Sequence, residues 1–144
     1  MQAATDDSPS LFRSILEQMT DAVIYADPEG TIVLWNDAAA ALFGHSAAEA
    51  AGRTLDLIVP AHLQSSHWRG FKQAIASGAL TLQGRPTLTR ANHQSGRKLY
   101  VEMTFALVKT GGGPVRGAVA VARDVTERVE QQRAAARRES VGDA

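Results

Sequence analysis

The last third of the sequence limits the possible folds most narrowly, because it predicts three consecutive strands joined by two short turns. The strands are expected over residues 80–90, 98–108 and 115–124. The first turn lies within residues 92–96, and the second contains the run Gly111-Gly112-Gly113-Pro114. Connections this short join neighbouring strands in antiparallel order, so this part of the chain predicts an antiparallel sheet.

The preceding residues predict two further strands and several helices. Strands over 21–26 and 31–36 flank a turn at Asp27-Pro28-Glu29-Gly30, and Asn36 can cap a helix over 38–43 that ends at Gly44. Short helical pieces follow around 47–51 and 55–58, and then a longer helix over 62–77. We therefore expect an α+β fold in which a five-stranded antiparallel sheet carries helices on one face, with a pocket between the sheet and the longer helix.

A helix is expected at each end of this unit. Ser8 and Pro9 begin an N-terminal helix whose apolar residues form one stripe, which must lie on the sheet or on a partner chain: Leu11, Phe12, Ile15, Leu16 and Met19. The run Asp124-Val125-Thr126-Glu127 has the spacing of a capping box and opens a polar helix with a weak heptad seam. The predicted segments are a tail and amphipathic helix over 1–20, a core domain over 21–125 and a C-terminal helix over 126–144.

Charge and hydropathy exclude several kinds of partner. Lysine plus arginine and aspartate plus glutamate each number 15, so no net field attracts nucleic acid or an anionic membrane. No apolar run approaches the roughly 20 residues of a membrane span. We expect a cytoplasmic protein that binds neither nucleic acid nor membranes.

Missing residue types exclude most catalytic chemistry. The chain contains no cysteine, which removes disulfides, thiolate metal sites, thiol nucleophiles and chromophores attached through sulfur. It also lacks a Gly-x-Ser-x-Gly nucleophile motif and a phosphate-binding loop. We therefore expect no enzyme activity. The four histidines, at positions 45, 62, 67 and 93, are the main candidates for metal ligands.

Residues 21–126 resemble the PAS sensor family in the order and spacing of several short motifs. The run from Asp27 to Ile32, followed by Trp35-Asn36-Asp37, is similar to the first hairpin of the family and the helix after it. Phe43-Gly44 and the later Ala50-Ala51-Gly52-Arg53 resemble its short middle helices. Arg123-Asp124-Val125-Thr126-Glu127-Arg128 resembles the motif that ends the last strand and opens a signalling helix. The resemblance implies a sensory, signal-transducing domain.

Within that family, the segment after Pro60 resembles the haem-binding oxygen sensors of the kinase and phosphodiesterase type. Those proteins carry an axial histidine seven residues after a proline, which corresponds here to His67. The resemblance implies haem b with His67 as the iron ligand, and a diatomic gas or a redox change as the signal. It implies that further residues line the pocket: Trp68 and Phe71 on the helix, Arg85 and Thr87 near the iron, and Met103 and Phe105 on the penultimate strand.

The pattern departs from that subgroup at three positions. Thr87 stands where the kinase type has an arginine that binds oxygen, and Arg85 stands where the phosphodiesterase type has a methionine ligand. Gln73 replaces a basic residue that pairs with a haem propionate, and Lys72 or Arg69 is the candidate substitute.

Other interpretations remain open from the sequence. His67, Phe71 and Ile75 share one helical face, which suits ordinary core packing as well as a haem pocket. The pocket could instead hold a metabolite, a fatty acid or a flavin without a covalent bond, or the chain could serve only as a dimerisation module. Expected partners are a second copy, through the N-terminal or C-terminal helix, and an output kinase or cyclase domain.

Overall fold

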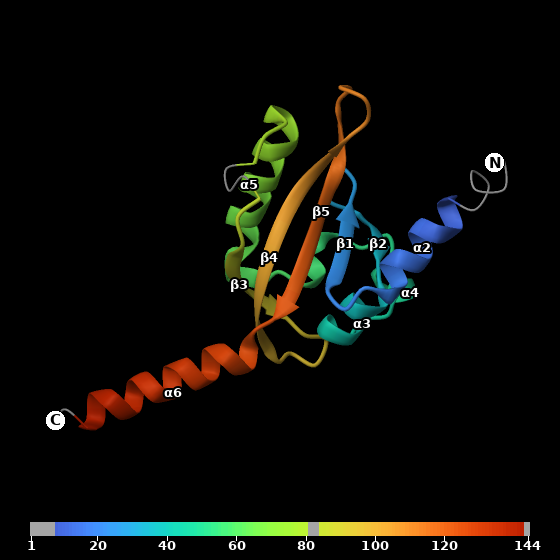
Figure 1. Ribbon diagram of the computed structural model, residues 1–144. Coiled ribbons are helices and arrows are strands. Elements are labelled where there is room, and N and C mark those ends of the chain that lie inside the picture. The colour runs from blue at the N-terminus through green and yellow to red at the C-terminus, as the bar shows by residue number, and fades with distance from the viewer. Residues whose placement is uncertain (1–7, 81–83, 143–144) are drawn as a thin grey trace.

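Five strands form one antiparallel sheet, in the order β2-β1-β5-β4-β3 (Figure 1). The computed structural model describes residues 8–80 and 84–142. The predicted α+β fold is confirmed, and the first strand in the chain lies beside the last. The strands are β1 (Ala22–Ala26), β2 (Ile32–Trp35), β3 (Thr87–Asn92), β4 (Lys98–Lys109) and β5 (Val115–Asp124).

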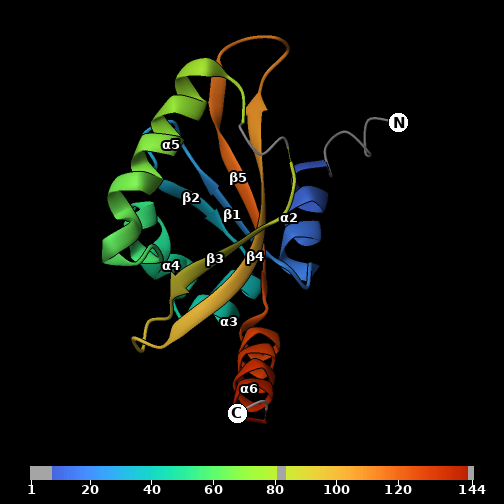
Figure 2. The same ribbon diagram turned by 90° about the vertical axis from the view of Figure 1, so that its left-hand side faces the viewer.

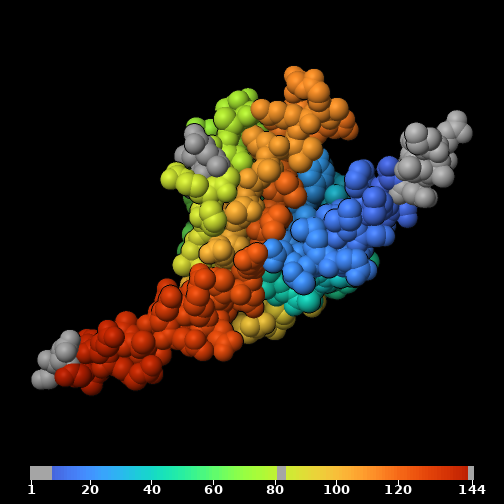
Figure 3. Space-filling view, in the orientation of Figure 1, coloured from blue at the N-terminus to red at the C-terminus, as the bar shows by residue number. Residues whose placement is uncertain are grey.

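Helices cover one face of the sheet, and two further helices extend from it. The covering helices are α3 (Asp37–Phe43), α4 (Ala47–Ala50) and α5 (Gln64–Ser77), with short 3₁₀ turns η1 (Leu55–Leu57) and η2 (Ala61–Leu63) between them. Helix α2 (Ser8–Gln18) lies on the other side of the sheet, as Figure 2 shows. Helix α6 (Thr126–Gly142) projects away from the end of β5 (Figures 1 and 3). None of the described helices is both long and apolar enough to cross a membrane.

Buried Asn36 joins three elements at the start of α3. Its Oδ1 accepts hydrogen bonds from the backbone N–H of Ala39 (3.0 Å) and of Val23 (2.9 Å), so it caps the helix and holds β1. Its Nδ2 donates to the carbonyl oxygens of Leu16 and Asp21, at 2.8 and 3.1 Å, which fixes the end of α2. The predicted cap and the predicted end of α3 at Gly44, where φ is +82°, are both confirmed.

The hydrophobic core lies between the sheet and the covering helices near α3 and α4. Its most completely buried large side chains are Phe43, Ile32, Leu99 and Val101. Helix α5 contributes no buried residue, although it has 14 residues and lies across the same face of the sheet. The core is therefore dense beneath α3 and α4 and thinner beneath α5.

Three sequence-based boundaries differ from the structure. Strand β3 begins at Thr87 rather than at residue 80; residues 84–86 are outside it, and residues 81–83 lie outside the described part of the chain. The helix predicted from residue 62 begins at Gln64, because 61–63 form a 3₁₀ turn. The capping box at 124–127 is not formed, because Asp124 accepts from the N–H of Thr126 and Glu127 bonds Gln131 instead.

Candidate functional site

His67 lies on α5 with its imidazole half-buried. Its Nδ1 is buried and has no hydrogen-bond partner among the described residues. Burial lowers the pKa of His67 below its ordinary value of 6.5, and the negative charge of Asp56 partly opposes that shift. The imidazole is therefore neutral at neutral pH, which is the form that can bind a metal ion.

Two aromatic rings of α5 pack around the His67 ring. The Trp68 ring lies 4.9 Å from it between centroids, nearly perpendicular to it, and the Phe71 ring lies 6.1 Å away at an interplanar angle of 30°. Trp68 and Phe71 also contact each other edge to face, at 5.5 Å. The His67 ring is thus held in an aromatic cluster and is not turned into bulk water.

Strands β3 and β4 place three of the sequence-predicted residues on the face of the sheet that carries the core. Met103 lies directly opposite Thr87 on β3, so the two side chains share a face. Phe105 follows two residues later and therefore points to the same side. Met103 is buried, whereas Thr87 and Phe105 are half-buried. Of these three, Met103 and Phe105 contact the core.

A row of alanines on β5 completes this face, and we did not single it out from the sequence. Ala122 and Ala120 lie opposite Met103 and Phe105, and Ala118 lies opposite Leu107. Ala118 and Ala120 remain half-buried, and no residue of α5 is buried. The side chains on this part of the strand are small, and those of the helix above it are incompletely buried. The signal in the sequence was the alternation of alanine with valine over residues 118–122.

The remaining predicted site residue, Arg85, lies two residues before β3 and is exposed. The structure does not extend the strand far enough to bring Arg85 into the ladder beside Thr87. The candidate propionate partners Arg69 and Lys72 are exposed on α5, as is Gln73. The charged groups near His67 therefore lie outside its aromatic cluster, apart from Asp56.

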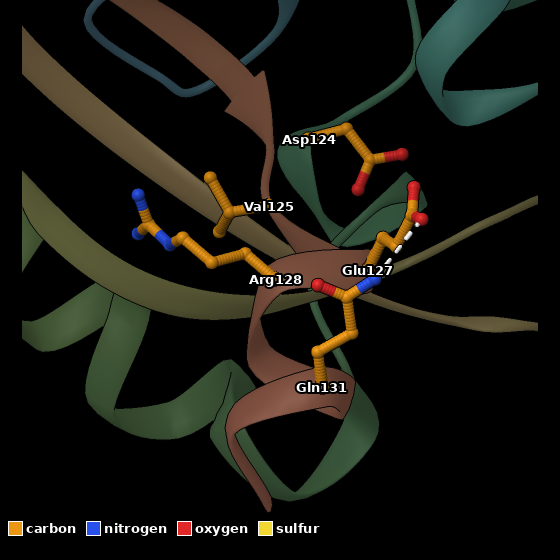
Figure 4. A pocket seen from close by; sticks show the side chains of 5 residues that line it. All are labelled: Asp124, Val125, Glu127, Arg128 and Gln131. Atoms are coloured by element: carbon orange, nitrogen blue, oxygen red, sulfur yellow. Dashed lines mark hydrogen bonds between the residues drawn. The ribbon is translucent and has the colours of Figure 1, made fainter. Parts of the chain in front are cut away.

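Two hollows of the described surface lie against α6 rather than beneath His67. The larger, of about 470 Å³, is lined by Asp124, Val125, Glu127, Arg128 and Gln131 (Figure 4). The Arg128 side chain extends away from the Asp124 and Glu127 carboxylates (Figure 4). The smaller, of about 270 Å³, is lined by Lys98, Tyr100, Glu130, Arg133 and Arg137. Neither hollow includes a residue of α5.

The donor set around His67 suits one kind of metal site. Within residues 8–80 and 84–142, no three histidine, aspartate or glutamate side chains lie together so that they could hold a bare metal ion. His67 offers a single buried imidazole nitrogen beside apolar walls. A single protein ligand and apolar walls are what the iron of a haem needs, because the macrocycle supplies the other four nitrogens.

The comparisons with known proteins agree with the fold. The family model described as PAS fold matches residues 10–125, and the chain belongs to the PAS family. It is a PAS sensory domain of the kind found in signalling proteins such as histidine kinases.

Three curated relatives show the contexts in which similar domains occur. The chain is 35% identical over 123 residues to an uncharacterised protein of Azorhizobium caulinodans, covering 85% of this chain and 16% of that protein. It is 28% identical over 120 residues to the sensor protein FixL of Bradyrhizobium diazoefficiens, covering 83% and 23%. It is 30% identical over 132 residues to the cell-division control histidine kinase PdhS of Brucella ovis, covering 89% and 12%. The chain thus spans less than a quarter of the length of each of these relatives.

Solved structures repeat the same architecture. The PAS domain of a Colwellia psychrerythraea protein superposes with a TM-score of 0.72 at 19% identity, covering 84% of this chain and 99% of that one. An RNA-binding light-oxygen-voltage receptor superposes with the same TM-score at 27% identity, covering 96% of this chain and 39% of that one.

Proposed function

We propose that this PAS domain binds haem b between α5 and the sheet, with His67 as the iron ligand, and responds to a diatomic gas or to redox state. The observation that carries the proposal is the buried Nδ1 of His67, which lacks a hydrogen-bond partner in the described part of the chain. A buried polar atom without a partner costs free energy, and a bound ligand is one way in which that cost is met. The similarity to the sensor protein FixL supports the sensory part of the assignment.

The residues around His67 suit the remaining requirements of such a site. The lowered pKa keeps the imidazole neutral and able to ligate. We expect the small alanine side chains of β5 to leave room beneath α5, with Phe71, Met103 and Phe105 as apolar walls of that space. Haem would supply the iron at which a gas binds or the redox state changes. Thr87, on the same face as Met103, carries a hydroxyl that can bond a polar ligand.

A signal must reach the C-terminal helix to be useful, and the structure contains a short route. Met103 and Phe105 belong to β4, whose residue Tyr100 is tied to the start of α6. The Tyr100 N–H donates to Thr126 Oγ1 at 2.9 Å, and the N–H of Val125 donates to the Tyr100 carbonyl at 2.8 Å. A ligand that favours one of two positions of β4 would therefore shift the start of α6. We propose that α6 leads this signal to an output kinase or cyclase domain and that the PAS domain itself is not catalytic.

A visible absorption spectrum tests the haem proposal directly. Purified protein titrated with haemin should develop a Soret band that is shifted from that of free haemin, at one haem per chain. His67→Ala should lose the shifted band, because it removes the iron ligand, whereas the matched control His62→Ala, an exposed histidine of η2, should retain it. Absence of a shifted band in the wild-type protein would overturn the proposal. A bound organic mass without iron in native mass spectrometry would favour a metabolite, a fatty acid or a non-covalent flavin.

A second candidate function, dimerisation, is favoured by a different observation. Helix α2 exposes 56% of Leu11, 62% of Phe12 and 49% of Ile15, and none of its residues is buried. An exposed apolar stripe of this kind is typical of a protein–protein contact. We propose a homodimer in which two α2 helices meet, which is compatible with a ligand at His67.

A further inference from the structure

We propose that Trp68 is a positioning residue, which fixes the rotation of α5 and thereby the direction in which His67 points. This inference rests on the proposed ligand site at His67. Trp68 directly follows His67 in the helix, so the two side chains leave the helix axis about 100° apart. Any contact that fixes the Trp68 ring therefore also fixes the bearing of the imidazole.

The Trp68 ring rests on the turn between β1 and β2. A Cβ atom at Gly30 would collide with the Cζ3 and Cη2 atoms of Trp68, so the ring occupies the space that any side chain at position 30 would need. Gly30 is itself buried, and its φ of +84° also favours glycine. Gly30 therefore serves two purposes: its backbone can adopt the conformation of this turn, and its lack of a side chain leaves space for the indole ring.

A hydrogen bond fixes the orientation of the ring in that space. The indole Nε1–H of Trp68 donates to Asp56 Oδ1 at 2.7 Å, in a partly buried position. A hydrogen bond to a carboxylate is stronger than one between neutral groups. Asp56 belongs to η1, and the N–H of Leu55 in that turn donates to the Gly30 carbonyl at 3.1 Å. Trp68, Asp56 and Gly30 thus form one connected contact, which we call the indole anchor.

The indole anchor matters because few other contacts hold α5, among them a hydrogen bond of 3.0 Å from Gln64 Nε2 at the start of the helix to the Val59 carbonyl. No residue of the helix is buried. At the opposite end of α5, the ammonium group of Lys109 on β4 donates to the Gly78 carbonyl at 2.8 Å, which satisfies one of the last carbonyl groups of the helix. Helix α5 is therefore held by contacts near both of its ends, and the indole anchor is the contact adjacent to His67.

The roles of Trp68 and Phe71 in the proposed site consequently differ. The polar end of the Trp68 indole is engaged by Asp56 and its benzene ring lies on Gly30, so the side chain is directed toward the β1–β2 turn. Phe71 lies one helical turn beyond His67, with its ring inclined by only 30° to the imidazole. We assign Phe71 to the wall of the ligand space and Trp68 to the support of the helix.

Hydrogen exchange of the α5 backbone, measured without added haem, tests the anchor independently of the ligand. Asp56→Ala and Trp68→Phe each remove the hydrogen bond, and the α5 amides should exchange about tenfold faster, the factor expected for one bond to a charged group. Asp56→Asn keeps an acceptor oxygen and should change exchange by less than about threefold. Arg69→Ala, an exposed change on the same helix, is the matched control and should match wild type.

Haem titration of the same variants then tests positioning. If the anchor positions His67, Asp56→Ala and Trp68→Phe should each weaken haem binding about tenfold. Asp56→Asn, which keeps an acceptor oxygen, should bind haem about as tightly as wild type. Unchanged exchange in both variants would overturn the anchor, and faster exchange with unchanged haem affinity would overturn the positioning role. If exchange accelerates while wild type shows no shifted Soret band, the haem proposal fails and the anchoring of α5 stands.

Discussion

At the scale of single residues, the packing of the His67 ring makes its protonation unfavourable. Its ring is packed against Trp68 and Phe71, and its Nδ1 is buried without a partner in the described chain. Packing of this kind favours the neutral ring, as the lowered pKa shows. Protonation would place a charge inside the aromatic cluster, relieved only in part by Asp56.

The lowered pKa predicts that His67 reduces the stability of the fold as the pH falls. The unfolded chain binds the proton near the ordinary pKa of 6.5, before the folded chain does, so the free energy of unfolding decreases below that pH until the folded pKa is reached. Urea unfolding of wild type and His67→Gln at pH 7.5 and pH 5 measures this effect. We expect wild type without haem to lose more stability between the two pH values than His67→Gln does. An equal loss in the two proteins would contradict the prediction.

The sequence indicated His67 but could not indicate its neighbours in space. Its distance from Pro60 and its helical face could be read along the chain. The space for Trp68 could not, because Gly30 is 38 positions earlier and its role appears only when the first hairpin folds against α5. The direction of Thr87 likewise followed from the strand register, which pairs it with Met103.

At the scale of elements, Tyr100 makes several of the contacts that hold the start of α6 against the sheet. The Tyr100 ring of β4 lies between two guanidinium groups, with Arg133 of α6 at 4.8 Å and Arg90 of β3 at 5.5 Å from its centroid. Arg133 Nη1 also donates to the Tyr100 hydroxyl at 2.7 Å, and Arg128 lies 3.6 Å from the Glu102 carboxylate. Val129 is buried, so part of the predicted heptad seam packs within its own chain.

Replacing Tyr100 should loosen α6 without unfolding the domain. Tyr100→Leu removes both the hydroxyl contact and the cation–π contacts, which contribute about 1 kcal/mol at exposed sites. The amides of the first two turns of α6 should therefore exchange about fivefold faster, while those of β1 should remain unchanged. Tyr100→Phe keeps the ring and should show a smaller effect. If Tyr100→Leu and wild type exchange at the same rate in α6, the contact does not hold the helix.

Elements with a strong local signal were predicted well, and the others were not. The turns at Gly30 and at 111–113 and the cap at Asn36 follow from local chemistry. The predicted start of β3 was wrong because β3 is an edge strand and pairs only with β4. The pairing with β4 begins at Thr87, and the strand begins there. The capping box at 124–127 was wrong because the Asp124 carboxylate accepts from the N–H of Thr126 and the Glu127 carboxylate accepts from Gln131.

At the scale of the whole molecule, the exposed surface of α2 predicts self-association. Leu11, Phe12 and Ile15 form a stripe that no other described element covers. Changing all three to serine should convert a dimer to a monomer with an unaltered circular dichroism spectrum, because these side chains make little contribution to the core. Sedimentation velocity over a range of concentrations measures the change.

A matched control is available on the same molecule. Leu88→Ser removes an equally exposed leucine, 56% accessible, from edge strand β3 and should leave the dimer intact. A wild-type protein that sediments as a monomer at every concentration would contradict the prediction, as would a triple variant that still forms dimers.

The neighbouring positions of β1 and β5 have a mechanical consequence for a longer chain. The backbone reaches β1 from α2 and leaves β5 for α6 at the same end of the sheet, where Ala22 pairs with Ala122 and Arg123 lies 3.2 Å from the Asp21 carboxylate. Two adjacent strands are about 4.8 Å apart. Helices α2 and α6 are thus connected through one pair of adjacent strands. A displacement of one helix can therefore pass to the other without crossing the core.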